Sequence, residues 1–236
     1  MSASTTASRV LAGDRRALAR LITAIESDDG AVDGVVAELV ESVTPARRVG
    51  VTGPPGVGKS TLVDAMIKEL RSRGDTVAVL AVDPSSPITG GALLGDRIRM
   101  QHHVDDPSVY IRSMASRGHL GGLAPSSSSA IAVLARAGFD VVLVETVGVG
   151  QSEVEVMDLV DVVVLVLGPD WGDQIQADKA GIVEITDVYV INKADRPGVD
   201  TVHRALLETL GDSEATVLVT TAITGEGVAA LVDAVR

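Results

Sequence analysis

The sequence contains no cysteine. This absence excludes disulfides, thiolate metal ligands and thiol nucleophiles, and it favours a reducing, cytoplasmic location. Positive charge is also scarce, because 20 Lys and Arg residues stand against 32 Asp and Glu residues, which gives a formal net charge of −12. A surface this acidic repels nucleic acid and anionic lipid over most of its area, so bound phosphate must meet a local cradle. We therefore expect no nucleic-acid partner.

Long apolar segments are missing as well. No run reaches the roughly 18 to 20 residues that span a bilayer, and the opening residues MSASTTASRV contain no hydrophobic signal core. We therefore expect no membrane association. A chain of 236 residues with 46% hydrophobic content can form one sizeable α/β domain with a small extension.

The first 45 residues carry two helical patterns. Residues 14–26 place Leu18, Leu21, Ile22 and Ile25 on one face, and Asp14 stands where an N-cap is expected. Residues 31–42 predict a second helix. We expect residues 1–45 to form an N-terminal helical extension and residues 46–236 to form the main domain.

Beyond Pro45, short runs of Val, Leu and Ile lack polar alternation, which is typical of strands buried on both faces. Parallel neighbours need crossover connections, and helical stretches separate most of the runs. The pattern predicts a three-layer α/β/α domain with a mostly parallel sheet of about seven strands, and the phosphate-binding motif described next makes this the fold of a P-loop NTPase. The expected strands are 47–53, 76–83, 108–114, 139–146, 161–168, 187–192 and 216–222, and the expected crossovers are 60–73, 127–137, 175–184, 201–210 and 227–235.

A phosphate-binding motif follows the first expected strand. The segment GPPGVGKST satisfies G-x-x-x-x-G-K-[ST] between a strand and a helix. Glycines let backbone N–H groups surround the β-phosphate, and the helix N-terminus adds positive partial charge. Lys59 is expected to reach the β- and γ-phosphates, and the Ser60 hydroxyl to ligate Mg²⁺. The candidate phosphate-binding residues are Gly53, Pro54, Pro55, Gly56, Val57, Gly58, Lys59, Ser60 and Thr61.

A base-binding motif, NKAD, follows the sixth expected strand and comprises Asn192, Lys193, Ala194 and Asp195. The Asp195 carboxylate can accept hydrogen bonds from N1–H and the 2-amino group of guanine, whereas adenine offers an acceptor and no amino group there. Charge-assisted bonds of about 1.5 to 3 kcal/mol each make discrimination of a hundredfold plausible. The motif therefore predicts GTP and GDP as ligands. One strand later, the loop containing Thr221, Ala222 and Ile223 could add contacts to the base.

Two apolar strands end in carboxylates that could hold Mg²⁺ directly or through water, Asp83 and Glu145. Glu145 stands where many P-loop proteins carry Asp, and its extra methylene suggests a water-mediated role. The backbone N–H of Gly148 could approach the γ-phosphate and sense hydrolysis. Between these strands, GGALLGDRIRM combines glycines with Asp96 and Arg99, which makes it a candidate switch.

Two further features carry weaker expectations. His102 and His103 lie near Asp105 and Asp106, but adjacent histidines project differently and no third ligand is evident, so we expect a solvated polar loop rather than a metal site. Trp171 is the single tryptophan. It is expected either to pack partly against the domain or to contact a partner.

Five segments occur in the order found in a known family: GPPGVGKST, VDPSSPITGGALLGDRIRM, RSMASRGHLGGLA, ETVGVGQSE and NKAD. Together with the helical opening VLAGDRRALARLITAIE, they closely resemble the MeaB/ArgK/MMAA family of G proteins over nearly the whole chain. The resemblance implies a GTPase that acts as a chaperone of an adenosylcobalamin-dependent acyl-CoA mutase, typically methylmalonyl-CoA mutase. Such a protein gates cofactor loading and protects the mutase.

The resemblance also implies roles for single residues. Lys59 and Ser60 would hold phosphate and Mg²⁺, while Asp83, Asp96 and Glu145 would surround the metal and the attacking water. The implied catalytic set is Lys59, Asp96, Glu145 and Gly148. Arg99 would belong to a switch, and Trp171, Asp173 and Lys179 would belong to a third mobile loop that faces the mutase.

The chain departs from the family pattern in two places. Pro169, Asp170 and Trp171 are unusual in the third loop. Family members also continue into helices that form a dimerisation arm, whereas this chain ends at Arg236. We therefore expect the arm to be absent and treat a homodimer as an open expectation.

Other functions remain alternatives on sequence grounds. A nickel-inserting GTPase shares this branch of P-loop architecture, although the chain has no cysteine and no histidine-rich tract. A kinase is suggested by the older transport-kinase name (LAO/AO) attached to such sequences, although no acceptor pocket is evident. A binding module that never hydrolyses nucleotide is the third alternative.

Overall fold

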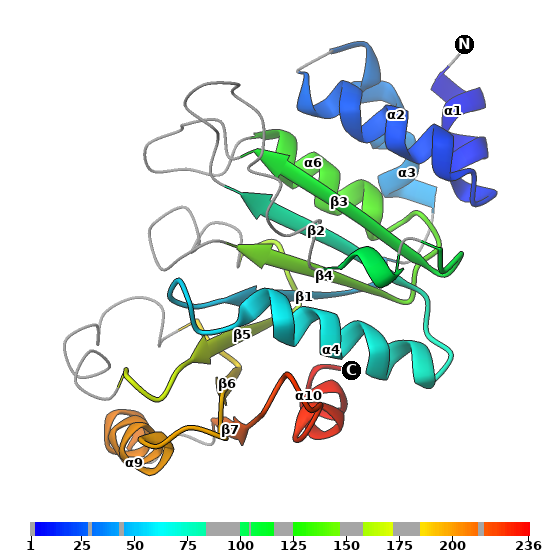
Figure 1. Ribbon diagram of the computed structural model, residues 1–236. Helices are drawn as coiled ribbons and strands as arrows, with labels where there is room; N and C mark the ends of the chain where they lie inside the picture. Colours follow the sequence, from blue (N-terminus) through cyan, green and yellow to red (C-terminus); the bar gives the residue numbers. More distant parts are fainter. Residues whose placement is uncertain are drawn as a thin grey trace, which may run out of the picture.

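A computed structural model describes residues 3–27, 30–42, 45–83, 100–103, 105–115, 125–146, 158–171, 185–211 and 215–236. Seven strands form one sheet in the order β3-β2-β4-β1-β5-β6-β7, and all neighbours pair in parallel (Figure 1). The strands are β1 (Arg47–Thr52), β2 (Val77–Asp83), β3 (Val109–Ala115), β4 (Val141–Thr146), β5 (Val162–Leu167), β6 (Val188–Ile191) and β7 (Thr216–Val219). This confirms the expected fold class and all seven expected strands.

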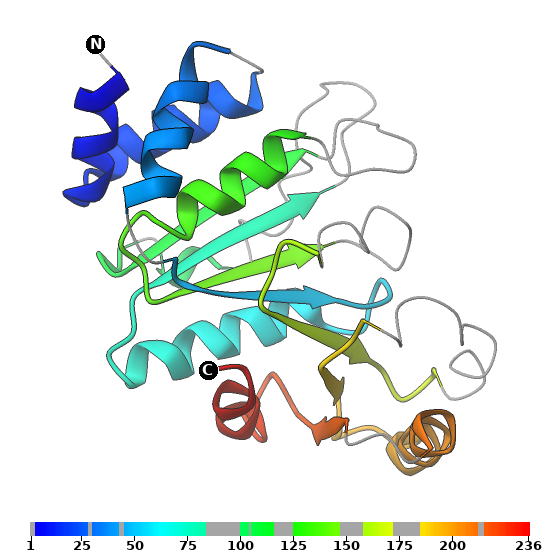
Figure 2. The same ribbon diagram turned by 180° about the vertical axis from the view of Figure 1, so that it is seen from behind.

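The inner strands are mostly apolar, which fits a sheet that helices cover on both faces. Every residue of β4, β5 and β6 is buried, as expected for a parallel sheet between two helical layers. One face packs against α4 (Lys59–Ser72) and α10 (Val228–Val235). The other face packs against α6 (Pro125–Leu134) and α9 (Val199–Leu210). Figure 2 shows the molecule from the opposite side to Figure 1.

The N-terminal helices pack on the α6 side of the sheet. They are α1 (Ala3–Leu11), α2 (Arg15–Glu26) and α3 (Asp33–Ser42), with a short 3₁₀ helix, η1 (Gly30–Val32), before α3. Asp14 caps α2 as expected, because its carboxylate accepts hydrogen bonds from the backbone N–H groups of Arg16 and Ala17 at 3.0 Å.

Two arginine contacts connect α2 with the edge strand β3. Arg15 Nη1 donates to the Val109 carbonyl at 2.6 Å, and Arg112 Nη2 lies 2.7 Å from Glu26 Oε2. These contacts add to the apolar packing of α2 against α6. The N-terminal helices therefore share one hydrophobic core with the sheet.

Helix α1 was not expected from the sequence. Serine and threonine make up much of it, and both residue types have modest helix propensity because their side chains compete for backbone hydrogen bonds. Ala7 and Val10 are buried against the neighbouring helices. Packing against α2 and α3 therefore supports a helix that local propensity alone does not indicate.

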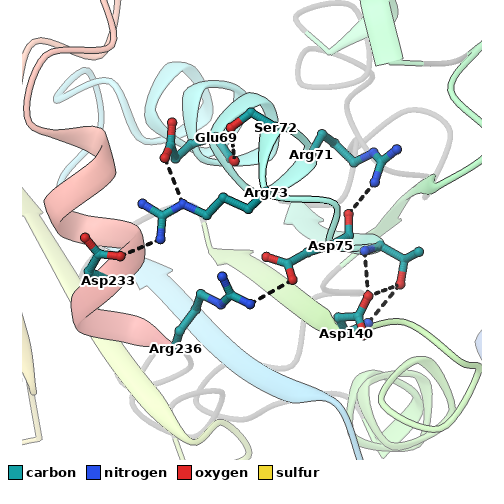
Figure 3. Close-up of polar contacts among 9 residues, drawn as sticks. Glu69, Arg71, Ser72, Arg73, Asp75, Asp140, Asp233 and Arg236 are labelled. Carbon is teal, nitrogen blue, oxygen red and sulfur yellow. Dashed lines mark hydrogen bonds and ion pairs between the residues drawn. The ribbon is translucent and has the colours of Figure 1, made fainter.

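A polar network lies at the amino-terminal edge of the sheet, where β2 and β4 begin (Figure 3). Arg73, at the end of α4, contacts Glu69 Oε1 at 2.8 Å and also pairs with Asp233 of α10. Arg236 Nη2 lies 2.9 Å from Asp75 Oδ1. The network thus ties the ends of α4 and α10 to the start of the sheet.

Asp140 belongs to the same edge and gives a pH-dependent prediction. Its carboxylate accepts hydrogen bonds at 2.7 Å from the backbone N–H and then the hydroxyl of Thr76, and these bonds lower the pKa of Asp140. A lowered folded-state pKa stabilises the fold above the unfolded-state pKa of about 4, and that stabilisation is lost as pH falls through the folded-state pKa. We expect Asp140→Asn to lower the melting temperature at pH 7, and the difference from wild type to shrink as pH falls below about 4.

Thermal unfolding followed by circular dichroism at several pH values measures this difference. Glu208→Gln, on the exposed side of α9, is a control that removes one carboxylate without removing such bonds. A wild-type advantage that is equal at pH 7 and pH 3 would show that the Asp140 carboxylate is not the source.

No helix within the described ranges has the length and apolar character needed to cross a bilayer.

Candidate functional site

The candidate site lies at the carboxyl ends of the strands, where ligands bind in open α/β sheets. The phosphate-binding motif at residues 53–61, here called the P-loop, follows β1. Glu145 is the next-to-last residue of β4, and Asn192 follows β6. Val51 of β1 pairs with Glu145 of β4 in the parallel register. The sheet therefore brings together side chains that are more than 80 residues apart in the sequence.

Two glycines allow the P-loop to fold tightly against its neighbours. Gly53 has φ of +140°, and a Cβ there would lie 2.1 Å from the Val166 carbonyl oxygen. Gly58 has φ of +97°, and a Cβ there would lie 2.7 Å from Asn192 Nδ2. Any other residue at either position would combine backbone strain with a clash. The glycines of the motif are thus required by the close approach of the neighbouring backbone and side chain.

Lys59 is buried at the first position of α4, with its ammonium group inside the loop. Its Nζ donates to the carbonyl of Gly53 at 2.6 Å and to that of Pro54 at 2.9 Å. The loop thus surrounds a buried positive charge at the N-terminus of a helix, an arrangement that favours a bound anion.

Ser60 and Glu145 meet across the site. The Ser60 hydroxyl donates to Glu145 Oε1 at 2.7 Å, and both residues are buried. A hydroxyl and a carboxylate are oxygen donors of the kind that Mg²⁺ accepts, and this ion usually takes few protein carboxylates. Consistent with that, the described residues contain no cluster of three or more His, Cys, Asp or Glu side chains able to hold a metal.

A cavity of about 470 Å³ connects these groups. This volume lies within the range of small-molecule sites. The lining residues are Pro55, Gly56, Gly58, Lys59, Ser60, Thr61, Val82, Glu145, Thr146 and Lys193. The structure therefore places most of the P-loop, one candidate carboxylate and the lysine of NKAD around one space.

Asn192 joins the base motif to the P-loop. Its side chain is buried, with Nδ2 donating to the Val57 carbonyl at 3.0 Å and Oδ1 accepting from the Thr220 hydroxyl and the Ala222 N–H, each at 3.1 Å. The amide thus connects the loops after β1 and β7. This role was not evident from the sequence, where Asn192 was considered only as a ligand-binding residue.

The remaining base-pocket candidates surround Asn192. Lys193 has φ of +63° and its Nζ contacts the Gly56 carbonyl, while Asp195 is exposed. Ala222 is buried, whereas Ile223 is 81% exposed. Asp195 and Ile223 are therefore accessible to solvent, whereas Ala222 is not.

Of the remaining magnesium and switch candidates, Asp83 falls within the described residues. Asp83 ends β2, and its backbone pairs with Ala115 of β3, so it lies at the same edge of the sheet as Glu145. The other candidates from the magnesium and switch segments lie outside the described residues. They are Asp96, Arg99, Gly148, Asp173 and Lys179.

Trp171 is partly buried near the P-loop. A Cβ placed on Gly168 would lie 3.8 Å from Cδ1 of the Trp171 ring and 3.5 Å from Cγ1 of Val57. The ring and the Val57 side chain therefore lie over the same glycine. Trp171 also packs against the core under α4. Of the two expectations for this residue, packing against the domain is the one that the structure displays.

The expectation that His102 and His103 form a solvated loop was wrong for His103. His103 belongs to the 3₁₀ helix η2 (Gln101–His103), its side chain is 10% exposed, and its Nε2 lies 2.9 Å from Asp64 Oδ1. His102 is 65% exposed. Asp64 was not predicted as a partner of His103, because the two residues are 39 positions apart and become neighbours only through tertiary packing.

Val82 and Thr146 also line the cavity, although neither was predicted as a site residue. Their positions beside Asp83 and Glu145, at the ends of β2 and β4, were the available signal.

Comparison with known proteins identifies the family. Residues 18–236 match the model of the family described as methylmalonyl Co-A mutase-associated GTPase MeaB. A protein of Pyrococcus abyssi named as a GTPase is 55% identical over 195 residues, covering 83% of this chain and 60% of the relative. The GTPase ArgK of Escherichia coli is 42% identical over 191 residues, covering 79% of this chain and 58% of ArgK.

A solved structure described as an LAO/AO transport system kinase is similar, with a TM-score of 0.77 at 29% identity. The match covers 99% of this chain and 74% of the chain in that structure. This chain spans about three fifths of the length of the two curated relatives. The family match nevertheless covers nearly all of its residues and includes the P-loop, Glu145 and NKAD. The chain therefore belongs to the MeaB family of GTPases.

Proposed function

We propose that this chain binds GTP with Mg²⁺, hydrolyses it slowly, and acts as a switch that gates cobalamin loading and protection of an acyl-CoA mutase. The observation that carries the nucleotide part is the union of two motifs in one site. Lys59, Ser60 and Glu145 line the same cavity as Lys193, and Asn192 holds the P-loop to the NKAD segment.

Phosphate binding would use the P-loop and Lys59. In the structure the Lys59 ammonium is held by two loop carbonyls. An incoming phosphate offers stronger, charge-assisted hydrogen bonds, so Lys59 would exchange these carbonyls for phosphate oxygens. The backbone N–H groups at the start of α4 would complete the cradle.

Mg²⁺ would be held by the Ser60 hydroxyl, with Glu145 acting through a coordinated water and Asp83 and Asp96 as further candidates. When bound, the ion would neutralise charge that develops on the transferred phosphoryl group. Glu145 already contacts Ser60 at 2.7 Å, so a small separation of the two side chains would make room for the ion. Gly148 would report on the γ-phosphate.

Guanine selection would fall to Asp195, with contacts from the loop of Thr221, Ala222 and Ile223. Asp195 is exposed and lies two residues after Lys193, which lines the cavity, so its carboxylate is accessible to a base. In this scheme Asn192 supports the base pocket rather than reading the base, because its amide already bonds to Val57, Thr220 and Ala222.

The mutase partner is supported by the family description, which names methylmalonyl Co-A mutase. Arg99, Asp173 and Lys179 would respond to nucleotide and face that partner, and Trp171 would lie at the base of the third loop. Hydrolysis would then act as a timer that changes loop geometry, and a homodimer is a further expectation from the family.

The nucleotide part is tested by the turnover of GTP and ATP by the purified chain, with Mg²⁺ and with EDTA. We expect GTP to be hydrolysed only with Mg²⁺ and ATP to be left intact. Radiolabel from the γ-phosphate should appear as inorganic phosphate. Equal use of ATP would contradict guanine selection, and transfer of the label to an acceptor other than water would favour a kinase.

The partner is tested by affinity capture from the source cell with the chain bound to a non-hydrolysable GTP analogue. We expect a subunit of an acyl-CoA mutase to be recovered, and purified mutase to change GTP turnover. The GDP-bound chain is the matched control for nucleotide dependence. Recovery of a nickel enzyme instead, together with stoichiometric Ni²⁺ binding, would support the nickel-insertion alternative.

A further inference from the structure

A buried histidine outside the nucleotide cavity contacts the helix that follows the P-loop. His103 Nε2 lies 2.9 Å from Asp64 Oδ1, and the side chains of the two residues are only 10% and 12% exposed. The other carboxylate oxygen of Asp64 accepts a hydrogen bond from Lys68 Nζ at 2.6 Å. Both oxygens of this largely buried carboxylate are therefore bonded, as burial of a charge requires.

Asp64 lies one helical turn after Ser60 on α4. Residues four apart project from the same side of a helix. On this side, Ser60 contacts Glu145 of β4 and Asp64 contacts His103 of η2. Two successive turns of α4 are thus held by polar contacts to two different parts of the chain.

The segment that carries His103 is attached to α4 at two points. We call residues 100–103 and 105–108 the strap. Met100 is fully buried in the core beneath α4, and the strap contacts the second turn of the helix through His103. Near the last turn, Arg71 Nε lies 2.9 Å from Asp106 Oδ2. None of these residues lines the nucleotide cavity.

We propose that His103 is a positioning residue for GTP hydrolysis that acts through Asp64. This inference rests on the proposed GTPase function. The contact fixes the orientation of α4 at the turn next to Ser60, and so would keep the Ser60 hydroxyl in place to hold Mg²⁺. Without the contact, the second turn of α4 has one polar anchor fewer, directly after the turn that must hold the metal and the phosphate.

The test compares a substitution that removes the hydrogen-bond donor with one that retains a donor. His103→Phe keeps a buried ring but removes the donor, whereas His103→Gln keeps an N–H donor of similar reach. We expect His103→Phe to lower kcat about tenfold, because small displacements in an active site cost that much or more. The Mg²⁺ concentration for half-maximal activity should rise severalfold, while GDP affinity measured without Mg²⁺ stays within about twofold. His103→Gln should restore both values.

Asp106→Asn is the matched control, because it weakens the same strap at the opposite end of α4. We expect it to lower the melting temperature and to leave kcat and the Mg²⁺ requirement unchanged. The inference is overturned if His103→Phe keeps wild-type kcat, or if Asp106→Asn lowers kcat as much and glutamine gives no rescue, since the strap would then act only on stability. Absence of GTP hydrolysis by the wild-type chain would instead overturn the proposed function, and this inference with it.

Discussion

Replacing Lys59 with alanine is expected to lower the single-turnover rate of GTP hydrolysis on the order of a hundredfold or more, since one lost electrostatic contact to a transition state has effects of this size. The Lys59 ammonium is buried between the carbonyls of Gly53 and Pro54, at the start of α4. It is the positive side chain that the P-loop offers to the phosphates, and alanine removes it without adding bulk. GTP affinity should fall as well.

Arg204→Ala is the control for this substitution. Arg204 lies on the exposed side of α9, so we expect hydrolysis within about twofold of wild type for a surface change of this kind. Equal activity of Lys59→Ala and wild type would contradict the assignment. Tight GTP binding by wild type without any single turnover would indicate a nucleotide-binding module instead of an enzyme.

Replacing Asp195 with asparagine is expected to weaken GTP binding about a hundredfold and to create affinity for xanthosine triphosphate. The carboxylate accepts hydrogen bonds from N1–H and the 2-amino group of guanine, whereas an asparagine NH₂ would face that amino group. Xanthine has a carbonyl at this position and can accept from the new amide. The exposure of Asp195, two residues after the cavity-lining Lys193, is compatible with a direct base contact.

Calorimetric titration of the two nucleotides measures this switch. Asp200→Asn, which removes an exposed carboxylate five residues later in α9, controls for the change in net charge. If Asp195→Asn still prefers GTP as strongly as wild type does, another group reads the base. Substitutions in the loop of Ala222 and Ile223 would then test whether that loop selects the base.

Sequence patterns were sufficient to predict the fold because each strand is locally consistent with its place in the sheet. The run DVVVLVLG is apolar on both faces, which suits only a strand covered on both sides, and β5 is buried at every position. The α2 pattern likewise placed Leu18, Leu21 and Ile22 in the core beneath a cap at Asp14. Helix α1 escaped prediction because its stability comes from α2 and α3 rather than from its own residues.

The candidate site was predictable to the extent that its chemistry lies in continuous motifs. GPPGVGKST and NKAD each place several functional groups within nine residues or fewer, so spacing alone indicated phosphate and guanine binding. Val82 and Thr146 entered the site only through strand register, which sets them beside the P-loop. His103 and Asp64 show the same limit, since a local pattern of histidines and aspartates suggested a solvated loop.

The sequence by itself determined the class of fold, the order of the strands along the chain and the two nucleotide-binding motifs, because these depend on periodicity and on residues close together in the chain. The tertiary structure decided which distant groups meet: Ser60 with Glu145, Asn192 with Val57 and Ala222, and His103 with Asp64. Such contacts depend on the order of strands in the sheet and on how α4 packs against it. Neither is encoded in any short segment of the chain.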